Sequence, residues 1–379
     1  MATASNTVRV GFVGVSGSDD PTLTGWANVT HLPALEALDG VVLAGVCATS
    51  PEKAQAAADR FGVPGYSSAA DMAAAQGIDI VAVTVKVPDH YDVVTAAIEA
   101  GKPVYCEWPL GNGLLEAEKM THHAATRDLR CAVGLQARAA PTIRYVRDLV
   151  AQGYIGDVLS TTLLGSGMNW GPGMLLRNAY TLDARNGATL LTIGVGHALD
   201  PLEFCLGRIE EVQTLSGLRR EEIHFVENSK TVKATAEDQW VIAARLESGA
   251  VASIHYRGGQ AGGQNLRWEI NGTEGDLVLS SDFGQMQPMT LALAGAKGGE
   301  RPEPMEIPPE YMLAGDLPDP ALNVAQAWAL FVSGSEDAAT FEDALHMHRL
   351  IDAIDQSART GRALVREFDK GVEVWCEAP

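Results

Sequence analysis

The chain lacks the features that mark disulfide-rich, membrane-spanning and secreted proteins. Cysteine is scarce: the chain has five, which is an odd number, and no two of them are spaced as CxxC. Neither a disulfide framework nor a cysteine-rich metal site is therefore expected. No apolar run approaches the ~18 residues that cross a bilayer, and the N-terminal segment lacks the form of a signal peptide. These absences predict a cytoplasmic protein that does not enter a membrane.

Positive charge is also in short supply. Lys and Arg number 28 against 48 Asp and Glu, which leaves a net charge of -20. Nucleic acid and anionic membranes are poor partners for such a surface, because phosphate contacts need clustered cations. The histidines of His122-His123 and His346-Met347-His348 face apart on predicted helices, so no metal site is expected. A small anionic ligand in a local cationic pocket stays possible.

The first part of the chain alternates between strand and helix patterns. Residues 8–15 and 79–85 are β-branched runs typical of buried parallel strands. Between them lies a helix pattern with Ser50 as its expected N-cap and Pro51 at its first position. The alternation repeats roughly every 25 to 35 residues, as right-handed βαβ crossovers require. We predict a doubly wound α/β Rossmann domain over residues 1–137.

The pattern changes after about residue 140. One amphipathic helix is followed by strand-like segments joined by short turns that carry glycine, such as Ser248-Gly249 and Asn271-Gly272. Such turns are typical of antiparallel hairpins. Residues 138–379 are therefore predicted to form an α+β domain with a large, mostly antiparallel sheet. Residues 295–320 are expected to be a surface loop, and a final helix is expected at about 341–360.

The first strand ends in the spacing Gly11-x-x-Gly14-x-x-Gly17, with Ser16 in the place of the second glycine of a dinucleotide fingerprint. Fingerprint glycines allow a tight turn and a close approach of the backbone to a pyrophosphate. Because a strand precedes the motif and a helix follows it, Gly14 and Ser16 are predicted to bind a dinucleotide. The alternative is an ordinary turn at the end of a strand.

The end of the second strand bears on the choice between NAD and NADP. An NAD site usually places an acid here to hold the ribose 2′-hydroxyl, and that acid repels a 2′-phosphate. The residues present are Ala48-Thr49-Ser50, followed by Lys53. Ser50 and Lys53 offer a hydroxyl and a cation, so we predict NADP, with NAD as a lesser possibility. Ser50 can equally serve only as a helix cap.

Several motifs together resemble the glucose-fructose oxidoreductase/inositol dehydrogenase (Gfo/Idh/MocA) family. The motifs are GWANVTHLPAL (25–35), VPDHYDVV (87–94), AGKPVYCEWPL (100–110), GLQAR (134–138), LVAQGYIGDV (149–158), GHALD (196–200) and INGTEGDL (270–277). The chain looks most like the branch that contains the NADP-binding co-repressor of the yeast galactose pathway. The resemblance implies two domains, a nicotinamide dinucleotide and a sugar-like or polyol substrate. It also implies cofactor contacts from Trp26, Ala27, Val85, His90, Glu107, Trp108 and Gln136.

The sequence departs from the family at two catalytic positions. Family enzymes carry a lysine where this chain has Trp108, and an indole has no amine to titrate. An aspartate expected four residues before His197 is replaced by Ile193. The resemblance makes His197 a candidate acid or base, although a histidine on an apolar helix is often a satisfied core residue. Lys86, partly desolvated at the end of a Rossmann strand, and Tyr180 are the other candidates.

The candidate substrate contacts all lie in the predicted second domain, beginning with its first residue. Asn169 and Trp170 can bond and stack on a sugar, although Trp170 can equally pack on a partner subunit. Asn186 can bond a polyol or simply form a turn. The remaining candidates are Arg138, at the end of the last Rossmann strand, and Asp200, which can orient His197 or hold its helix.

The sequence therefore predicts an NADP-dependent oxidoreductase that transfers hydride between nicotinamide and a carbinol carbon of a sugar, sugar derivative or polyol. The alternative is a catalytically silent sensor that binds NADP and a sugar. A third possibility is transient oxidation and re-reduction of one carbon so that a bond elsewhere can break. A sheet with one open face favours a homodimer or homotetramer.

Overall fold

The computed structural model describes residues 7–18, 25–228 and 230–378, and they divide into two compact units. The first unit holds the chain up to Ala139 together with Met312–Leu345. The second holds Ala140–Tyr311 and the residues from His346 onward. The sequence predicted a single boundary after residue 137. The structure differs because the later segment, 312–345, carries an apolar helix that packs into the first unit.

The first unit is built on a six-stranded parallel sheet in the order β3-β2-β1-β4-β5-β6. Four successive residues at the end of β1 are buried, as expected for a strand covered on both faces. The strand order reverses between β1 and β4, where doubly wound sheets bind ligands. The predicted Rossmann fold is confirmed. The strands are β1 (Val8–Val13), β2 (Val41–Cys47), β3 (Gly65–Tyr66), β4 (Ile80–Val83), β5 (Val104–Glu107) and β6 (Ala132–Gly134).

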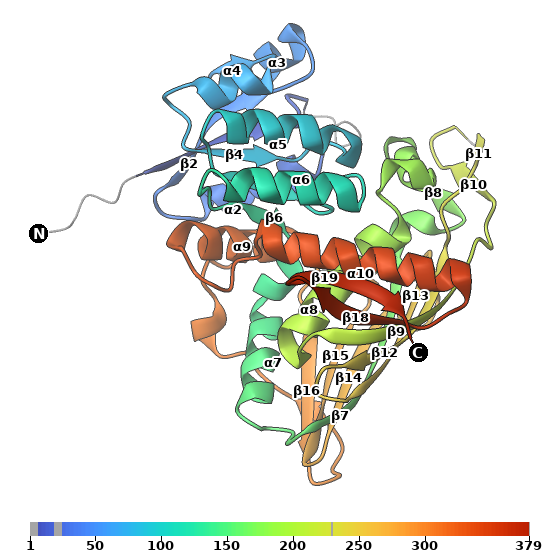
Figure 1. Cartoon of the computed structure of the whole chain (residues 1–379). Coiled ribbons are helices and arrows are strands. Elements are labelled where there is room, and N and C mark those ends of the chain that lie inside the picture. The colour runs from blue at the N-terminus through green and yellow to red at the C-terminus, as the bar shows by residue number, and fades with distance from the viewer. Residues whose placement is uncertain (1–6, 19–24, 229, 379) are drawn as a thin grey trace, which may run out of the picture. The chain divides into compact units, whose positions relative to one another are not determined.

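The helices of the first unit follow the strands in sequence (Figure 1). The helical segment from Trp26 to Glu36 is divided at Thr30, where φ is -127° and ψ is -63°. Ser50 caps α3 and Pro51 is at its first position, as predicted. The helices are α1 (Trp26–Val29), α2 (His31–Glu36), α3 (Pro51–Phe61), α4 (Ala69–Ala74), η1 (Val87–Asp89), α5 (His90–Glu99), α6 (Leu114–Ala125), η2 (Gln136–Ala139) and α9 (Ala321–Ser333).

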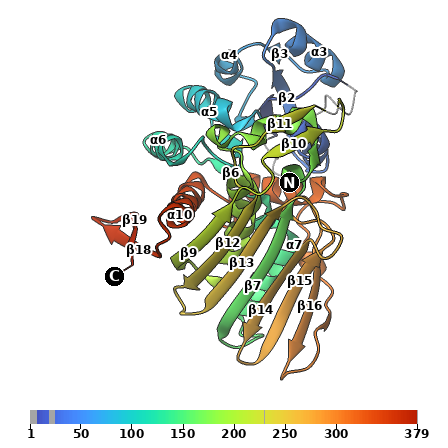
Figure 2. The same ribbon diagram turned by 90° about the vertical axis from the view of Figure 1, so that its right-hand side faces the viewer.

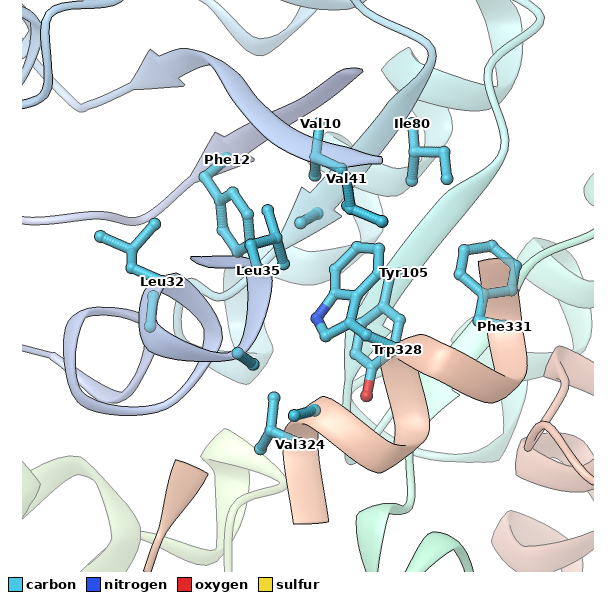
Figure 3. Close-up of a cluster of buried hydrophobic side chains, with 14 of the residues drawn as sticks. Val10, Phe12, Leu32, Leu35, Val41, Ile80, Tyr105, Val324, Trp328 and Phe331 are labelled. Atoms are coloured by element: carbon cyan, nitrogen blue, oxygen red, sulfur yellow. The ribbon is translucent and has the colours of Figure 1, made fainter. Parts of the chain in front are cut away.

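Helix α9 was not predicted, yet it supplies much of the core of the first unit. It carries Trp328 and Phe331 into a cluster with Phe12 and Tyr105 (Figure 3). The rings of Trp328 and Tyr105 are stacked with centroids 4.4 Å apart and planes 13° apart. Burying one such ring contributes roughly 1.5–3 kcal/mol, so this late segment is integral to the nucleotide-binding fold.

The second unit is built on a ten-stranded sheet in the order β17-β16-β15-β14-β7-β13-β12-β9-β18-β19. Figure 2 shows the strands from β9 to β16 side by side. All neighbours are antiparallel except β7 and β13, which are parallel, so the prediction of a mostly antiparallel sheet is confirmed. The strands are β7 (Val158–Gly167), β9 (Ile209–Gly217), β12 (Gln239–Leu246), β13 (Val251–Gly258), β14 (Leu266–Gly272), β15 (Gly275–Ser281), β16 (Ala292–Lys297), β17 (Glu303–Pro304), β18 (Leu364–Asp369) and β19 (Val372–Glu377).

One face of this sheet is buried and the other is open. Along β12 the side chains of Trp240 and Ile242 are buried, whereas Val241 between them is 43% exposed. This alternation is what a strand with one covered face requires. Helices α7 and α8 lie on one side of the sheet (Figure 1). The helical segments of the second unit are α7 (Pro141–Ala151), η3 (Met168–Trp170), η4 (Leu176–Leu182), η5 (Ala184–Asn186), the π-helix η6 (Leu190–Val195), α8 (Gly196–Leu206) and η7 (Pro309–Tyr311).

Three smaller features complete the description. A second sheet joins β8 (Gly173–Met174), β10 (Glu222–Phe225) and β11 (Thr231–Lys233). The helix expected at about 341–360 is α10 (Phe341–Thr360). The expected loop at 295–320 is partly ordered, because it contains the end of β16, all of β17 and η7. No helix in the described part of the chain is long and apolar enough to cross a bilayer.

Candidate functional site

Two glycines hold the loop after β1 in a closely packed path. Gly14 has φ of +108°, and a Cβ there would lie 2.9 Å from backbone atoms of Thr84. A Cβ on Gly17 would lie 2.6 Å from backbone atoms of Ala56 and Ala57 in α3. Neither position has room for a side chain. The loop therefore makes the close backbone approach that a dinucleotide fingerprint needs.

An asparagine outside the predicted site fixes the conformation of Ser16. The Ser16 amide donates to Oδ1 of Asn28 at 2.9 Å, and Nδ2 of Asn28 donates to the Ser16 carbonyl at 2.8 Å. The Ser18 amide donates to Oγ of Ser16 at 3.2 Å. Ser16 thus shapes the loop with both its backbone and its side chain. Among the described residues, the amides of Val15 and Gly17 are left without an acceptor.

Trp26 and Ala27, the two predicted cofactor residues of α1, differ in their surroundings. Ala27 is buried in the core of the first unit. Nε1 of Trp26 is buried, and no acceptor for it exists among the residues that the structure describes. Buried indole N–H groups normally have a partner. This donor is therefore one that a bound ligand can satisfy.

The end of β2 carries the residues expected to distinguish NADP from NAD. Oγ of Ser50 accepts the Lys53 amide at 3.3 Å, which makes Ser50 the N-cap of α3. Nζ of Lys53 lies 3.4 Å from Oγ1 of Thr49. One cation and two hydroxyl groups are therefore gathered where an NAD site usually has an acid. The capping role of Ser50 is confirmed, and its contact with a 2′-phosphate stays a prediction.

His90 joins the loops that follow β4 and β5. Its side chain is buried, with Nδ1 at 2.9 Å from the carbonyl of Pro109 and Nε2 at 3.1 Å from that of Val85. Burial lowers the pKa of His90. Both ring nitrogens face backbone carbonyls, and a neutral ring donates to one of them, so His90 connects these loops. The cofactor contact that the resemblance implied for His90 stays a prediction.

Lys86 follows β4 at the predicted edge of the sheet, but its side chain is exposed. The chain leaves the sheet at Val83, and of the two flanking valines only Val87 is buried. The desolvation beside a bound nicotinamide and the role of Lys86 in proton transfer both stay predictions.

Glu107, the last residue of β5, is held through one carboxylate oxygen. Its Oε1 accepts Nε2 of Gln136 at 2.7 Å and Nε2 of His31 at 2.9 Å. Nε1 of Trp328 donates to the other ring nitrogen of His31 at 2.9 Å. Trp108, the residue after Glu107, is buried and precedes a cis peptide bond. His31 and Trp328 were not predicted, because the apolar pattern of their helices gives no sign of a polar contact.

Arg138 has a different partner from the predicted sugar. Its Nη1 lies 3.2 Å from Oδ1 of Asp343, and the side chain is buried. Burial alone would raise the pKa of Asp343, but Arg138 and Thr340 lower it. The ion pair ties η2 to the start of α10 within the first unit. Since the guanidinium is used in this way, the structure favours a structural role for Arg138.

His197 stands at the start of α8 in the second unit. It is 4% exposed, and its Nδ1 has no hydrogen-bond partner among the described residues. Burial lowers its pKa to about 3, so the imidazole is neutral. A π-helix, η6, leads directly into α8, and such irregularities are common at functional sites. Asp200, one turn further along α8, is also buried.

Tyr180 and Asn186 lie in the short helices before η6. Burial raises the pKa of the Tyr180 hydroxyl, which keeps it protonated and able to donate a hydrogen bond. Nδ2 of Asn186 donates to the Tyr180 carbonyl at 2.8 Å. The amide therefore fixes the turn, which was the alternative interpretation of Asn186.

Asn169 and Trp170 form most of η3, at the end of β7. Trp170 is 2% exposed, and its Nε1 donates to the carbonyl of Thr181 at 3.2 Å. A ring this deeply buried cannot stack on a sugar, so the predicted substrate contact is wrong for Trp170. Oδ1 of Asn169 accepts Nδ2 of Asn178 at 2.9 Å. Trp170 supports the loop, and Asn169 stays a candidate.

These features define a class of protein before any comparison. A parallel sheet with strand order 3-2-1-4-5-6 and a glycine loop after β1 is a Rossmann-type dinucleotide-binding fold. Residues 8–135 match the oxidoreductase family with an NAD-binding Rossmann fold. Residues 141–281 match the C-terminal domain of Gal80p. The first match covers the predicted Rossmann domain and the second covers the first part of the sheet domain, so the predicted resemblance to this oxidoreductase family and to its Gal80-like branch is confirmed.

Named relatives include both dehydrogenases and regulators. The dehydrogenase aclE of Aspergillus oryzae is 27% identical, over 96% of this chain and 100% of its own. The galactose/lactose metabolism regulatory protein GAL80 of Kluyveromyces lactis is 29% identical, over 78% of this chain and 69% of its own. The crystal structure of that organism's Gal80p superposes with a TM-score of 0.81, at 25% identity, over 95% of this chain and 92% of that one.

A more distant neighbour carries a cofactor. A levoglucosan dehydrogenase in complex with NADH and L-sorbose has a TM-score of 0.77 at 21% identity, and the match covers 98% of this chain and 99% of that one. This likeness shows the fold. Together with the family match, it supports a nicotinamide dinucleotide as the cofactor class.

Proposed function

We propose that the chain is an NADP-dependent oxidoreductase that transfers hydride between nicotinamide and a carbinol carbon of a sugar, sugar derivative or polyol. One observation carries the proposal. At the carboxyl edge of the first unit's sheet, a loop too tight for side chains lies against helix α3, which begins beside Ser50 and Lys53, and no acid stands at the end of β2. A pyrophosphate and a 2′-phosphate both suit such a site.

The residues present fit the dinucleotide. Gly14 and Gly17 have no side chains that would keep a pyrophosphate away from the backbone. Three donors have no acceptor among the described residues: the amides of Val15 and Gly17, and Nε1 of Trp26. Lys53 supplies a cation for a phosphate. When bound, the nicotinamide accepts or donates the hydride. The protein's contribution is to hold the cofactor and to manage the substrate's proton.

Proton transfer in this protein cannot use the family lysine, because Trp108 stands in its place. His197 is the first candidate, since its imidazole is neutral and its Nδ1, without a partner among the described residues, can accept a hydrogen bond from a substrate hydroxyl. Tyr180, protonated, can donate one or orient the substrate. Lys86 is the third candidate. The relatives named as dehydrogenases, and a neighbour crystallised with L-sorbose, support a sugar-like substrate.

A second function, ligand sensing without turnover, is favoured by one specific observation. The residue that replaces the family lysine is an indole that is 5% exposed, so it is built into the core and cannot act as an acid or base. A relative is named as a regulatory protein. In this case the protein binds NADP and a sugar, and a change of shape or affinity is the output.

A spectroscopic titration separates the two functions. The purified protein is mixed with NADPH or NADP, and a panel of sugars, uronates, glycosides and their keto forms is added while absorbance near 340 nm is followed. Oxidoreduction changes the absorbance with the right substrate. Saturable binding by calorimetry with no absorbance change for any compound supports the sensor. If neither nicotinamide dinucleotide binds, both proposals fail.

The cofactor preference is tested at Ser50. Ser50→Asp keeps an N-cap but places a carboxylate where a 2′-phosphate is proposed to bind. We expect NADP to bind at least about tenfold more weakly, equivalent to ~1.4 kcal/mol, and NAD to be favoured. Ser50→Asn is the matched control, because it caps the helix without charge and should keep the preference. An unchanged NADP/NAD ratio in Ser50→Asp removes the argument for NADP.

The expected homodimer or homotetramer stays a prediction. Its support is the open face of the second unit's sheet, where Leu215 and Val241 are cross-strand neighbours and are 72% and 43% exposed. Exposed apolar patches of this kind mark association surfaces.

A further inference from the structure

A chain of hydrogen bonds in the first unit ends on Glu107 and begins at Trp328. Nε1 of Trp328 donates to Nδ1 of His31 at 2.9 Å. An indole N–H can only donate, so Nδ1 of His31 must be the acceptor and carries no proton. The proton of this neutral imidazole is therefore on Nε2, which donates to Oε1 of Glu107 at 2.9 Å. The tautomer of His31 is fixed by a residue 297 positions away.

The same carboxylate oxygen is held from a second side. Nε2 of Gln136 donates to Oε1 of Glu107 at 2.7 Å. Glu107 is paired in register with Gly134 of β6, and a Cβ on Gly134 would lie 2.5 Å from that oxygen. The Glu107 carboxylate thus occupies space that a side chain at position 134 would fill. Oε2 has no hydrogen-bond partner among the described residues.

Burial distinguishes this arrangement from an accidental surface contact. The side chains of His31, Trp328 and Gln136 are all completely buried, whereas that of Glu107 is 13% exposed. The three buried side chains therefore support one partly exposed group, the carboxylate of Glu107, at the end of β5. A buried polar chain in which each donor faces an acceptor holds one geometry.

We propose that Trp328 and His31 are positioning residues of the dinucleotide site: by fixing the tautomer of His31 they saturate Oε1 of Glu107, so that Oε2 faces a hydroxyl group of the bound dinucleotide as an acceptor. The proposal rests on the proposed function only for the identity of that ligand. The arrangement is not a proton relay. A second proton on His31 would have to occupy Nδ1, which faces the indole N–H of Trp328.

The test uses Trp328→Phe, which keeps a ring in the stack on Tyr105 and removes the donor. Without it, Nδ1 of His31 has no donor beside it, so only the contact with Glu107 holds the ring, and the hold on Oε1 is loosened. We expect dinucleotide affinity to fall about tenfold, or ~1.4 kcal/mol. The matched control is Trp268→Phe in the second unit. Trp268 is also completely buried and donates to Oγ1 of Thr161 at 2.8 Å, and this change should leave dinucleotide affinity intact.

A spectroscopic readout separates positioning from a general loss of stability. In protein labelled with ¹⁵N at the histidine rings, the His31 signals, assigned by their loss in His31→Gln, should show the Nε2–H tautomer in the wild type. In Trp328→Phe the Nδ1 signal should shift, because the indole donor to that nitrogen is gone. His31→Gln offers one acceptor and one donor, so it should retain more affinity than His31→Leu.

The outcomes are distinct. If the wild type binds no dinucleotide, the proposed function fails, while the His31 tautomer still tests the hydrogen-bond chain. If the wild-type tautomer is Nδ1–H, the inference is overturned. It is also overturned if Trp328→Phe binds the dinucleotide as the wild type does, or if Trp268→Phe loses as much affinity. A selective loss in Trp328→Phe with a changed His31 signal supports it.

Discussion

At the scale of single residues, burial rather than a neighbouring charge sets the chemistry of His197. Desolvation is the cause that lowers its pKa to about 3. A neutral imidazole at neutral pH can accept a proton but cannot supply one. The same desolvation disfavours the imidazolium that proton transfer would form, so it weakens His197 as a base and leaves it suited to accept a hydrogen bond from the substrate hydroxyl.

The corresponding prediction concerns His197→Asn, which keeps a polar side chain but removes the basic nitrogen. If His197 takes the substrate proton, kcat/KM for the oxidation should fall by about 10²- to 10⁴-fold, with NADP affinity unchanged because the residue belongs to the second unit. Stopped-flow absorbance and calorimetry measure the two quantities. His224→Asn, at an exposed position of β10, is the control. A retained rate would exclude His197 as the base.

Local residue roles were predictable, and distant pairings were not. Ser50 as a cap follows from a short pattern, because the cap and the amide that it accepts are three positions apart. Arg138 was assigned to a substrate because its partner, Asp343, lies in a segment that the sequence gave no reason to place nearby. Trp170 was assigned to a sugar because an exposed and a buried tryptophan look alike in a sequence.

At the scale of elements, the loop after β1 and helix α1 act as one piece. Asn28 both accepts from the Ser16 amide and donates to its carbonyl, as a neighbouring strand would. Helix α1 has only four residues, too few to be stable without tertiary contacts. The two bonds from Asn28 therefore stabilise the loop and the short helix together.

Asn28→Asp tests this coupling with almost no change in shape. The carboxylate can still accept from the Ser16 amide, but its second oxygen faces the Ser16 carbonyl and adds negative charge beside the proposed pyrophosphate. We expect NADP affinity to fall at least about tenfold and the free energy of unfolding to drop by ~1–3 kcal/mol. Calorimetry and urea denaturation measure these changes. Asn228→Asp in an exposed turn is the control, and equal affinities in both variants would contradict the coupling.

The elements themselves were largely predictable, with two instructive exceptions. The β-branched runs and glycine turns indicated both sheets, because period and turn chemistry are local signals. The parallel contact of β7 with β13 was not visible, since register between distant strands is a tertiary property. Helix α9 lacks the polar face that marks a surface helix, because nearly all of it is buried.

At the scale of the whole molecule, stability should depend on pH through a buried histidine of the second unit. His346 lies between two carboxylates, with Nε2 at 2.7 Å from Glu203 and Nδ1 at 2.7 Å from Glu373. Burial alone would lower the pKa of His346, but these carboxylates outweigh it and raise the pKa to about 9. Both ring nitrogens donate, so the ring is a cation that joins α10 to α8 and β19.

The sign of the pH dependence follows from the direction of each shift. The folded pKa of His346 lies above its ordinary value of 6.5, so its stabilisation is complete below about pH 6.5 and is lost as the pH rises toward 9. His197 has a lowered pKa, so its contribution is lost as the pH falls from 6.5 toward 3. The pKa values of Glu203 and Glu373 are also lowered, which adds to the acid loss. Stability should therefore be greatest near neutral pH.

His346→Gln should remove the alkaline part of this profile. A shift of this size corresponds to about 3 kcal/mol at ~1.36 kcal/mol per pKa unit, and the variant should lose an amount of this order at pH 6.5. Between pH 6.5 and 9 the wild type should then approach the variant, because deprotonation removes the same cation. Urea denaturation, which adds no salt, measures the free energy of unfolding across the range. His122→Gln, at an exposed position of α6, should follow the wild type. A constant difference between His346→Gln and the wild type from pH 6.5 to 9 would show that the ring is not a cation in the folded protein.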